Sequence, residues 1–351
     1  MSTTAAAGVA RAGRPREDVR RPRHGSPLGV LVLALVVAAA GLLSLVVGSR
    51  SIAPGTVLDV LLRPDGSEVS TIVHGLRVPR TVLGLAVGAA LGVAGALMQG
   101  HTRNPLAEPG LLGVSSGAAF AVVLSIHVLG VSDTAGYAWF ALVGAGLASV
   151  AVFAIGSTRR GPDPVSLVLA GAAITALLAS LTQAVVLRDV DVLDSYRFWV
   201  VGSTAGRGTD VLRQVAPFLA AGLLLAATSA PGLNLLQLGD DVARSLGMHP
   251  ARHKVLGVTA VMLLAGGATA ACGPIAFLGL VVPHLARFLT GPDYRWVVPY
   301  AGLLGALLLV LTDTLGRVIA RPGEVQVGIV MALVGGPIFV LLVRRTRMVR
   351  L

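Results

Sequence analysis

Residues 255–286 read VLGVTAVMLLAGGATAACGPIAFLGLVVPHLA, a long stretch without a single Asp, Glu, Lys or Arg. As one α-helix it would be about 48 Å long, at about 1.5 Å per residue, whereas the hydrocarbon core of a bilayer is about 30 Å thick. Gly273-Pro274 lies near its middle, and proline removes a helical hydrogen-bond donor. The stretch therefore predicts two membrane-spanning helices, the second short and ending near Arg287.

The rest of the chain is similarly apolar: 54% of its residues are hydrophobic, 13% are charged, and the mean hydropathy is +0.81. This composition excludes an ordinary soluble domain. Helices are the expected form, because lipid offers the backbone no hydrogen-bond partners. Eight more runs lack charged side chains, and nearly all reach the roughly 17 to 25 residues of a spanning helix: residues 28–49, 81–100, 109–132, 134–158, 164–187, 214–239, 296–312 and 325–343. The sequence thus predicts an all-α polytopic membrane protein with about ten transmembrane helices.

The distribution of positive charge supports ten helices rather than nine. With ten helices and the N-terminus inside, eighteen of the 28 Arg and Lys residues fall on the cytoplasmic side. Without the split at Gly273-Pro274 they divide equally between the two sides. The positive-inside rule therefore favours ten helices with both termini in the cytoplasm. The net charge of +11 follows this topology and the anionic lipid, so no nucleic-acid partner is implied.

Three regions follow from these boundaries. Residues 1–27 are rich in Arg, Pro and Ala and have no apolar periodicity, which predicts a disordered basic cytoplasmic tail. Residues 28–345 form the predicted transmembrane domain, with a charged cytoplasmic loop at 231–251. Residues 346–351 form a short cytoplasmic C-terminal tail.

Within that loop, residues 238–248 read LGDDVARSLGM, the one well-charged, helix-competent stretch between two long apolar runs. Asp240 and Asp241 at its start and Arg244 near its end match the dipole of a short helix, and the flanking glycines are typical helix stops. Every fourth residue is apolar, which predicts a stripe that can enter a groove of a partner. A helix lying on the inner membrane face is the alternative. The stripe consists of Leu238, Val242 and Leu246.

The sequence offers no catalytic, cofactor or metal motif. It contains neither a Gly-x-Ser-x-Gly elbow nor a His-Glu-x-x-His pair. A phosphate-binding loop needs Gly-Lys-Ser/Thr, and the single lysine, Lys254, lies between His253 and Val255. Any ATP must therefore be bound by another subunit. Asp313 and His284 lie near the ends of spans rather than at the bilayer centre, which disfavours an ion-coupled secondary transporter, the alternative class.

Four stretches, in this order, resemble one family of membrane proteins. They read RVPRT (77–81), NPLAEPGLLGVSSG (104–117), LGDDVARSLG (238–247) and GPIAFLGLVVPHLAR (273–287). Together they resemble the permease subunits of ATP-binding-cassette (ABC) importers for ferric siderophores, haem and cobalamin, the FecCD/BtuC-like family. The likeness extends over about residues 28–345, nearly the whole chain outside the tails.

This resemblance implies the BtuC-like fold of type II ABC importer permeases, located in the cytoplasmic (inner) membrane and working by alternating access. It implies a second permease copy or a close paralogue, two ABC ATPase subunits that bind ATP and Mg, and an extracytoplasmic substrate-binding protein. Ferric siderophores are the expected cargo on family frequency. Cobalamin and haem are the alternative, because no residue of the sequence is diagnostic of one ligand.

The resemblance also assigns roles to particular residues. Arg77, Arg80 and Arg317 are expected to pair with carboxylates of the binding protein, since guanidinium groups bind carboxylates bidentately; snorkelling to the membrane interface is the alternative. The turn at Asn104, Pro105 and Leu106 is expected to lie beside the cytoplasmic gate, with a plain turn as the alternative. ATPase coupling is assigned to Leu238, Gly239, Asp240, Asp241, Val242, Ala243, Arg244, Ser245, Leu246 and Gly247.

Overall fold

The computed structural model describes residues 25–131, 133–158 and 161–345, so residues 1–24 and 346–351 of the two predicted tails lie outside it. Seven of its helices are long and apolar enough to cross a membrane, and three shorter apolar helices join them. The predicted all-α architecture with ten apolar helices is confirmed. The seven include α1 (Pro27–Val46), α4 (Val78–Thr102), α6 (Thr134–Gly156), α7 (Pro164–Val186), α9 (Thr209–Gln237), α11 (Pro250–Cys272) and α13 (Tyr294–Ile319), and the three are α5 (Val114–Leu129), α12 (Leu278–Thr290) and α14 (Val327–Arg345).

Short elements join these helices. A π-helical turn, η1, makes α3, η1 and α4 one continuous helix over Glu68–Thr102. A two-residue antiparallel pair connects α6 to α7. The short elements are α2 (Pro54–Leu62), α3 (Glu68–Ile72), η1 (Val73–Arg77), the 3-10 turn η2 (Pro109–Leu112), β1 (Ser157–Thr158), β2 (Gly161–Pro162), α8 (Val190–Val200) and α10 (Asp240–Ser245).

The long apolar stretch breaks where the glycine-proline pair predicts. α11 ends at Cys272, and Gly273 has a φ of 75°, a left-handed conformation that favours glycine. The Cys272 carbonyl accepts a hydrogen bond from the Ser203 backbone N–H at 2.7 Å. Irregular backbone in a membrane domain needs protein around it to satisfy such groups, and the segment after α8 supplies it here. The second helix ends at Thr290, slightly beyond the predicted end near Arg287.

Small residues let α4 touch its neighbours backbone to backbone. A Cβ atom at Gly88 would lie 2.4 Å from the carbonyl oxygen of Gly305 on α13, and a Cβ at Gly305 would lie 2.2 Å from that of Gly88. About two helical turns further along α4, a Cβ at Gly95 would lie 2.0 Å from the carbonyl oxygen of Gly279 on α12. Small residues at these positions thus allow the close helix packing that is common in membrane domains, and α4 also contacts α1, α9 and α11.

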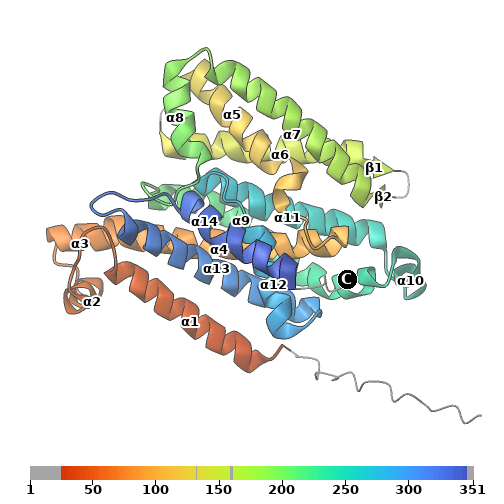
Figure 1. The fold of residues 1–351 in the computed structure, drawn as a ribbon, viewed down its shortest axis with the longest axis horizontal. Helices are drawn as coiled ribbons and strands as arrows, with labels where there is room; N and C mark the ends of the chain where they lie inside the picture. Colours follow the sequence, from red (N-terminus) through yellow and green to blue (C-terminus); the bar gives the residue numbers. More distant parts are fainter. Residues whose placement is uncertain (1–24, 132, 159–160, 346–351) are drawn as a thin grey trace, which may run out of the picture.

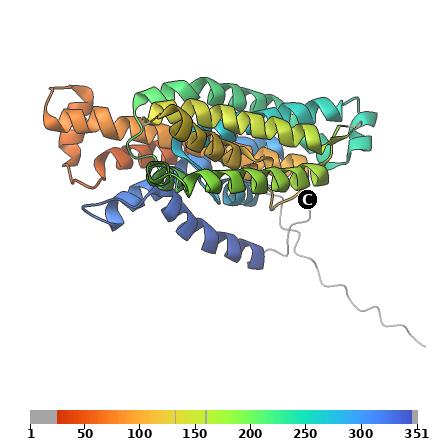
Figure 2. The same ribbon diagram turned by 90° about the horizontal axis from the view of Figure 1, so that it is seen from above.

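The axes of the long helices are roughly aligned (Figure 1). In the same view, α5, α6, α7 and α8 form a group on one side of α4, α11 and α13. α2 and α3 lie at one end of the molecule and α10 at the other, in both views (Figures 1 and 2). α1 begins and α14 ends at the same end as α10 (Figure 1). The molecule thus has two opposite polar ends, and each carries predicted functional residues.

Candidate functional site

At one end, residues 238–248 form the short helix that their charges predict. α10 spans Asp240–Ser245 and lies between Gly239 and Gly247, whose φ angles are 105° and 81°. Ala243 is fully buried and attaches the helix to the domain. The three stripe residues instead face outward: Leu238 is 59%, Val242 45% and Leu246 60% exposed. An apolar stripe on an otherwise charged helix is a surface suited to a groove of another protein.

Asp240 ties this helix to two others. Its Oδ2 accepts a hydrogen bond from Lys254 Nζ of α11 at 2.6 Å, and its Oδ1 accepts one from Arg103 NH2, just after α4, at 2.6 Å. Burial raises the pKa of Asp240, but the hydrogen bonds from Lys254 and Arg103 outweigh this effect, so its pKa lies below the ordinary value. The neighbouring Asp241 accepts from Arg244 of the same helix at 2.6 Å, and its side chain is almost fully exposed. The two adjacent aspartates therefore differ in their structural connections.

The predicted gate residues form a tight turn directly beside Asp240's partner. Arg103 ends α4 in the left-handed region, with a φ of 49°. Asn104 Oδ1 then accepts a hydrogen bond from the Leu106 N–H at 2.9 Å, and the Asn104 carbonyl accepts one from the Ala107 N–H at 3.1 Å. Asparagine side chains commonly stabilise turns in this way. Pro105 lies inside the turn, which the structure thus places next to α10.

Beyond the turn, the chain returns into the helical domain. η2 packs against α12, since a Cβ at Gly279 would lie 2.9 Å from Pro109 Cδ. A cavity of about 210 Å³ adjoins this contact, lined by Glu108, Thr269 and Ile275 among others. The turn at 104–106 therefore leads, within a few residues, from the neighbourhood of α10 to Glu108 at this cavity.

At the opposite end, two of the three predicted docking arginines are buried. Arg77 is 6% exposed and donates hydrogen bonds to the carbonyl oxygens of Leu45, Val46 and Arg50 at 2.7, 2.8 and 2.5 Å. Arg317 is 2% exposed and donates to the Ser44 and Val47 carbonyl oxygens at 3.0 and 3.1 Å.

The two buried arginines have their partners within the chain. Arg77 and Arg317 satisfy the carbonyl groups at the C-terminal end of α1, which would otherwise lack partners. Their guanidinium groups are therefore used within the chain in this conformation and do not project toward a partner. The sequence does not indicate this structural role, because no local pattern shows that the end of α1 lies against these two arginines.

The third arginine, Arg80, belongs to a network of charges at the same end. Its Nε donates to both Asp313 carboxylate oxygens at 3.1 Å, and its NH1 donates to Glu324 Oε2 at 2.6 Å. Arg317 NH2 lies 3.1 Å from Asp313 Oδ2, and Thr204 Oγ1 donates to Asp313 Oδ1 at 2.5 Å. The network joins α4, α13, the segment after α8 and the segment before α14. Arg80 lies 233 and 244 positions from its two partners in the sequence, which gives no sign of these contacts.

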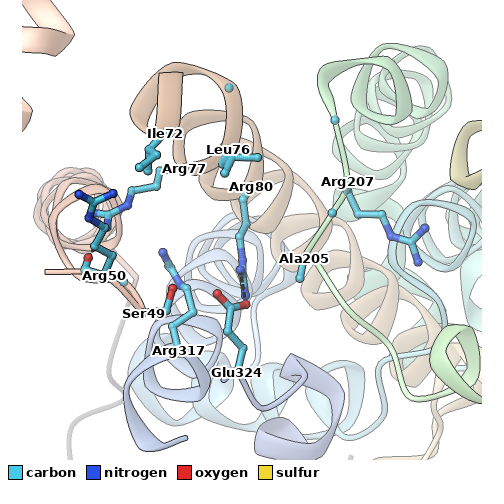
Figure 3. Close-up of a pocket in the computed structure, with 14 residues that line it drawn as sticks. Ser49, Arg50, Ile72, Leu76, Arg77, Arg80, Ala205, Arg207, Arg317 and Glu324 are labelled. Carbon is cyan, nitrogen blue, oxygen red and sulfur yellow. Dashed lines mark hydrogen bonds and ion pairs between the residues drawn. The ribbon is translucent and has the colours of Figure 1, made fainter. Parts of the chain in front are cut away.

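A cavity of about 430 Å³ opens beside this network, lined by all three predicted arginines together with Arg50, Arg207 and Glu324. Figure 3 shows Arg80 and Glu324 directed toward each other while Arg207 points away from them. Burial lowers the pKa of Arg207, and its Nε donates to the Ser203 carbonyl at 3.5 Å. Arg50 pairs with Glu68 at the outer edge. Sequence reasoning assigned no role to Arg50, Arg207 or Glu324.

Two polar ends joined by a bundle of ten apolar helices, one end carrying an outward-facing apolar stripe and the other an arginine-lined cavity, define a multi-pass membrane transport subunit. Residues 35–345 match the model of the FecCD transport family. The chain belongs to this family.

Known proteins resemble this chain along most of its length. It is 45% identical over 317 residues to the ferric enterobactin transport system permease protein FepD of Escherichia coli (strain K12), covering 90% of this chain and 94% of that protein. It is 40% identical over 321 residues to the iron(3+)-hydroxamate import system permease protein FhuB of Bacillus subtilis (strain 168), covering 91% and 83%. A solved structure described as an inward-facing conformation of a metal-chelate type ABC transporter superposes with a TM-score of 0.79 at 28% identity, covering 90% of this chain and 98% of that one.

Proposed function

We propose that this chain is the permease subunit of an ATP-driven importer that moves ferric siderophores across the cytoplasmic membrane by alternating access. The cargo rests on the relatives: FepD is named for ferric enterobactin, FhuB for iron(3+)-hydroxamate, and a further relative, 40% identical over 326 residues, for Fe(3+)-citrate. These ligands share a ferric ion held by an organic chelator. The chelated metal is cargo, and the permease holds no cofactor of its own in this proposal.

α10 is the surface that engages the ATPase, and its outward-facing apolar stripe is the observation that carries this assignment. A stripe of Leu238, Val242 and Leu246 left in water is unfavourable, at roughly 25 cal/mol per Å² of apolar surface. A groove on a partner would remove this cost. The assembly then contains a second permease copy or close paralogue and two ATPase subunits that bind ATP and Mg. In this orientation the α10 end, the start of α1 and the end of α14 are cytoplasmic.

The opposite end receives the extracytoplasmic substrate-binding protein. The cavity lined by Arg77, Arg80 and Arg317 keeps the proposed docking role. Arg50 and Glu324 present the more exposed charges on its rim, and Arg80 holds Glu324 in place from inside. Arg77 and Arg317 contribute by holding the end of α1 in place. Charged rims guide association and make its rate dependent on salt. The turn at Asn104, Pro105 and Leu106 acts as the cytoplasmic gate, since it links Arg103, the partner of α10, to Glu108 at the cavity between η2 and α12.

The test is reconstitution of the purified permease with the ATPase and binding protein encoded beside it. Proteoliposomes should take up a ⁵⁵Fe-labelled tricatecholate or trihydroxamate chelate only when ATP is present on the ATPase side. Haem and cobalamin serve as competing cargoes, and uptake of either in place of the iron chelates would replace the siderophore assignment. Uptake driven by a proton gradient without ATP would contradict the importer proposal as a whole.

A further inference from the structure

One carboxylate connects the cytoplasmic helix α10 to the rest of the domain by charged hydrogen bonds. Each oxygen of Asp240 accepts from a different cation: Oδ2 from Lys254 and Oδ1 from Arg103, both at 2.6 Å. Hydrogen bonds between ionised groups are stronger and more directional than neutral ones. With both oxygens engaged, the carboxylate is fixed in orientation between the start of α11 and the end of α4.

The two cations differ in exposure, since 39% of the Arg103 side chain remains accessible to solvent. Lys254 is the only lysine of the chain, and its side chain is only 13% exposed. An ammonium group removed from water in this way depends on its counter-ion. Arg103 adopts a left-handed backbone conformation that costs a non-glycine residue about 1 kcal/mol. That conformation turns the chain out of α4 and lets the Arg103 side chain reach Asp240.

A second contact in the same region is neutral. Gln237 at the end of α9 donates through Nε2 to the carbonyl oxygen of Gly100 in the last turn of α4, at 2.9 Å. This bond holds α9 to α4 whether or not α10 moves. Asp240 is different, because it is itself the first residue of α10 and so moves with that helix.

We propose that Asp240 is a positioning residue that transmits the displacement of α10 to the gate turn. When the ATPase shifts α10, the Asp240 carboxylate carries Arg103 with it, and Arg103 is bonded through the backbone to Asn104, the first residue of the turn. Lys254 keeps α11 in the same moving unit. This inference rests on the proposed coupling role of α10 and adds the residue pair through which that role reaches the gate.

The experiment uses the complete transporter with its ATPase and binding protein in proteoliposomes, and measures chelate transported per ATP hydrolysed. In Asp240→Asn, one carboxylate oxygen becomes an amide nitrogen, which donates hydrogen bonds and cannot accept them. One of the two cations therefore loses its partner. We expect transport per ATP to fall about tenfold, which is about 1.4 kcal/mol of coupling, while ATPase subunits co-purify in normal amount. Arg103→Gln and Lys254→Gln should show the same loss.

Conservative changes separate positioning from general support of the fold. Arg103→Lys and Lys254→Arg keep the positive charge and should retain most of the transport per ATP. Asp133→Asn is the matched control: Asp133 lies just before α6 and caps that helix by accepting from the Gly136 N–H at 2.8 Å, and asparagine caps equally well. This control should transport normally.

A double-mutant cycle tests the link directly. If Asp240 acts through Arg103, the Asp240→Asn and Arg103→Gln double variant should be little worse than either single variant. Fully additive losses, or Asp240→Asn transport per ATP equal to that of Asp133→Asn, would overturn the inference. If the ATPase subunits failed to co-purify with the unaltered permease, the coupling role of α10 itself would be overturned. The two failures are therefore distinguishable.

A distance measurement gives a readout independent of transport. Spin labels at Ser245→Cys in α10 and Leu106→Cys in the turn, with Cys272→Ala to remove the native thiol, report whether the two segments move together. With Asp240 present, their separation should be the same in the ATP-free and ATP-bound transporter. In Asp240→Asn it should change on ATP binding. A separation that changes with Asp240 present would contradict the proposal.

Discussion

Arg80 and Asp313 form a two-pronged ion pair between α4 and α13, with Arg80 NH2 2.8 Å from Asp313 Oδ1 and both side chains nearly buried. Asp313 also balances the charge of Arg317. Replacing Asp313 with Asn therefore removes a negative charge that compensates the buried guanidinium groups of Arg80 and Arg317. We expect the free energy of unfolding to fall by about 3 kcal/mol, measured as a lower midpoint of thermal unfolding in detergent.

The exposed pair of Arg50 and Glu68 supplies the control for this prediction. Both side chains are largely in solvent, where ion pairs contribute little and are screened by salt. Glu68→Gln should leave the unfolding midpoint almost unchanged. Equal effects of Glu68→Gln and Asp313→Asn would show that the buried network does not stabilise the domain.

The contact between α4 and α13 is sensitive to one methyl group. Gly88→Ala would place a Cβ atom 2.4 Å from the backbone oxygen of Gly305, so the two helices must separate. We expect a loss of about 2 kcal/mol in the free energy of unfolding and lower yield of folded protein. Gly146→Ala, in α6 and in open space, should be neutral or slightly stabilising, since alanine favours helix more than glycine does.

The pH dependence of coupling follows from Asp240. The pKa of this carboxyl group lies below its ordinary value of 3.8, so its contribution is present above the ordinary pKa and is lost only as the pH falls through the lowered one. Transport per ATP should therefore stay constant from about pH 8 to pH 5. This ratio cancels the pH dependence of ATP hydrolysis itself. A decline between pH 8 and pH 6 would indicate that a group of higher pKa carries the coupling.

The turn after α10 requires glycine for its backbone alone. Gly247 has a φ of 81°, and a Cβ there would meet nothing within 4 Å. Gly247→Ala should therefore cost about 1 kcal/mol of backbone strain and reorient the apolar stripe, which lowers transport per ATP more than it lowers the unfolding midpoint. Gly55→Ala in α2 also meets open space and should change neither quantity. Normal transport by Gly247→Ala would mean that the orientation of α10 is not set by this turn.

Local patterns sufficed for the elements and failed for contacts between distant residues. Gly273-Pro274 marked the break in the apolar stretch, and the charges and glycines around residues 240–245 marked α10, because both signals lie within a few residues. The links from Asp240 to Arg103, and from Arg80 to Asp313, join residues 137 and 233 positions apart. Several other pairings would satisfy the same charges, and only the packing of the helices selects among them.

The arginines show how such a pattern can mislead. Arg77 and Arg317 lie at the end of the molecule opposite α10, and arginines that border apolar stretches commonly meet partners or lipid head groups. Their burial depends on α1 ending beside them, and its apolar sequence contains no feature that specifies this neighbour. Burial of a charge was thus a tertiary property that the residues themselves did not reveal.

The glycine contacts of α4 also determine where motion can be measured. Gly88 and Gly305 meet without intervening side chains, and a Cβ at Gly92 would lie 2.2 Å from the carbonyl oxygen of Ala301 on the same partner helix, so α4 and α13 are in close backbone contact at two levels. These two helices therefore form a common reference frame during the transport cycle. Probes attached to α4 and α13 should keep a constant separation in every state, and the displacement of any other helix can be expressed against them.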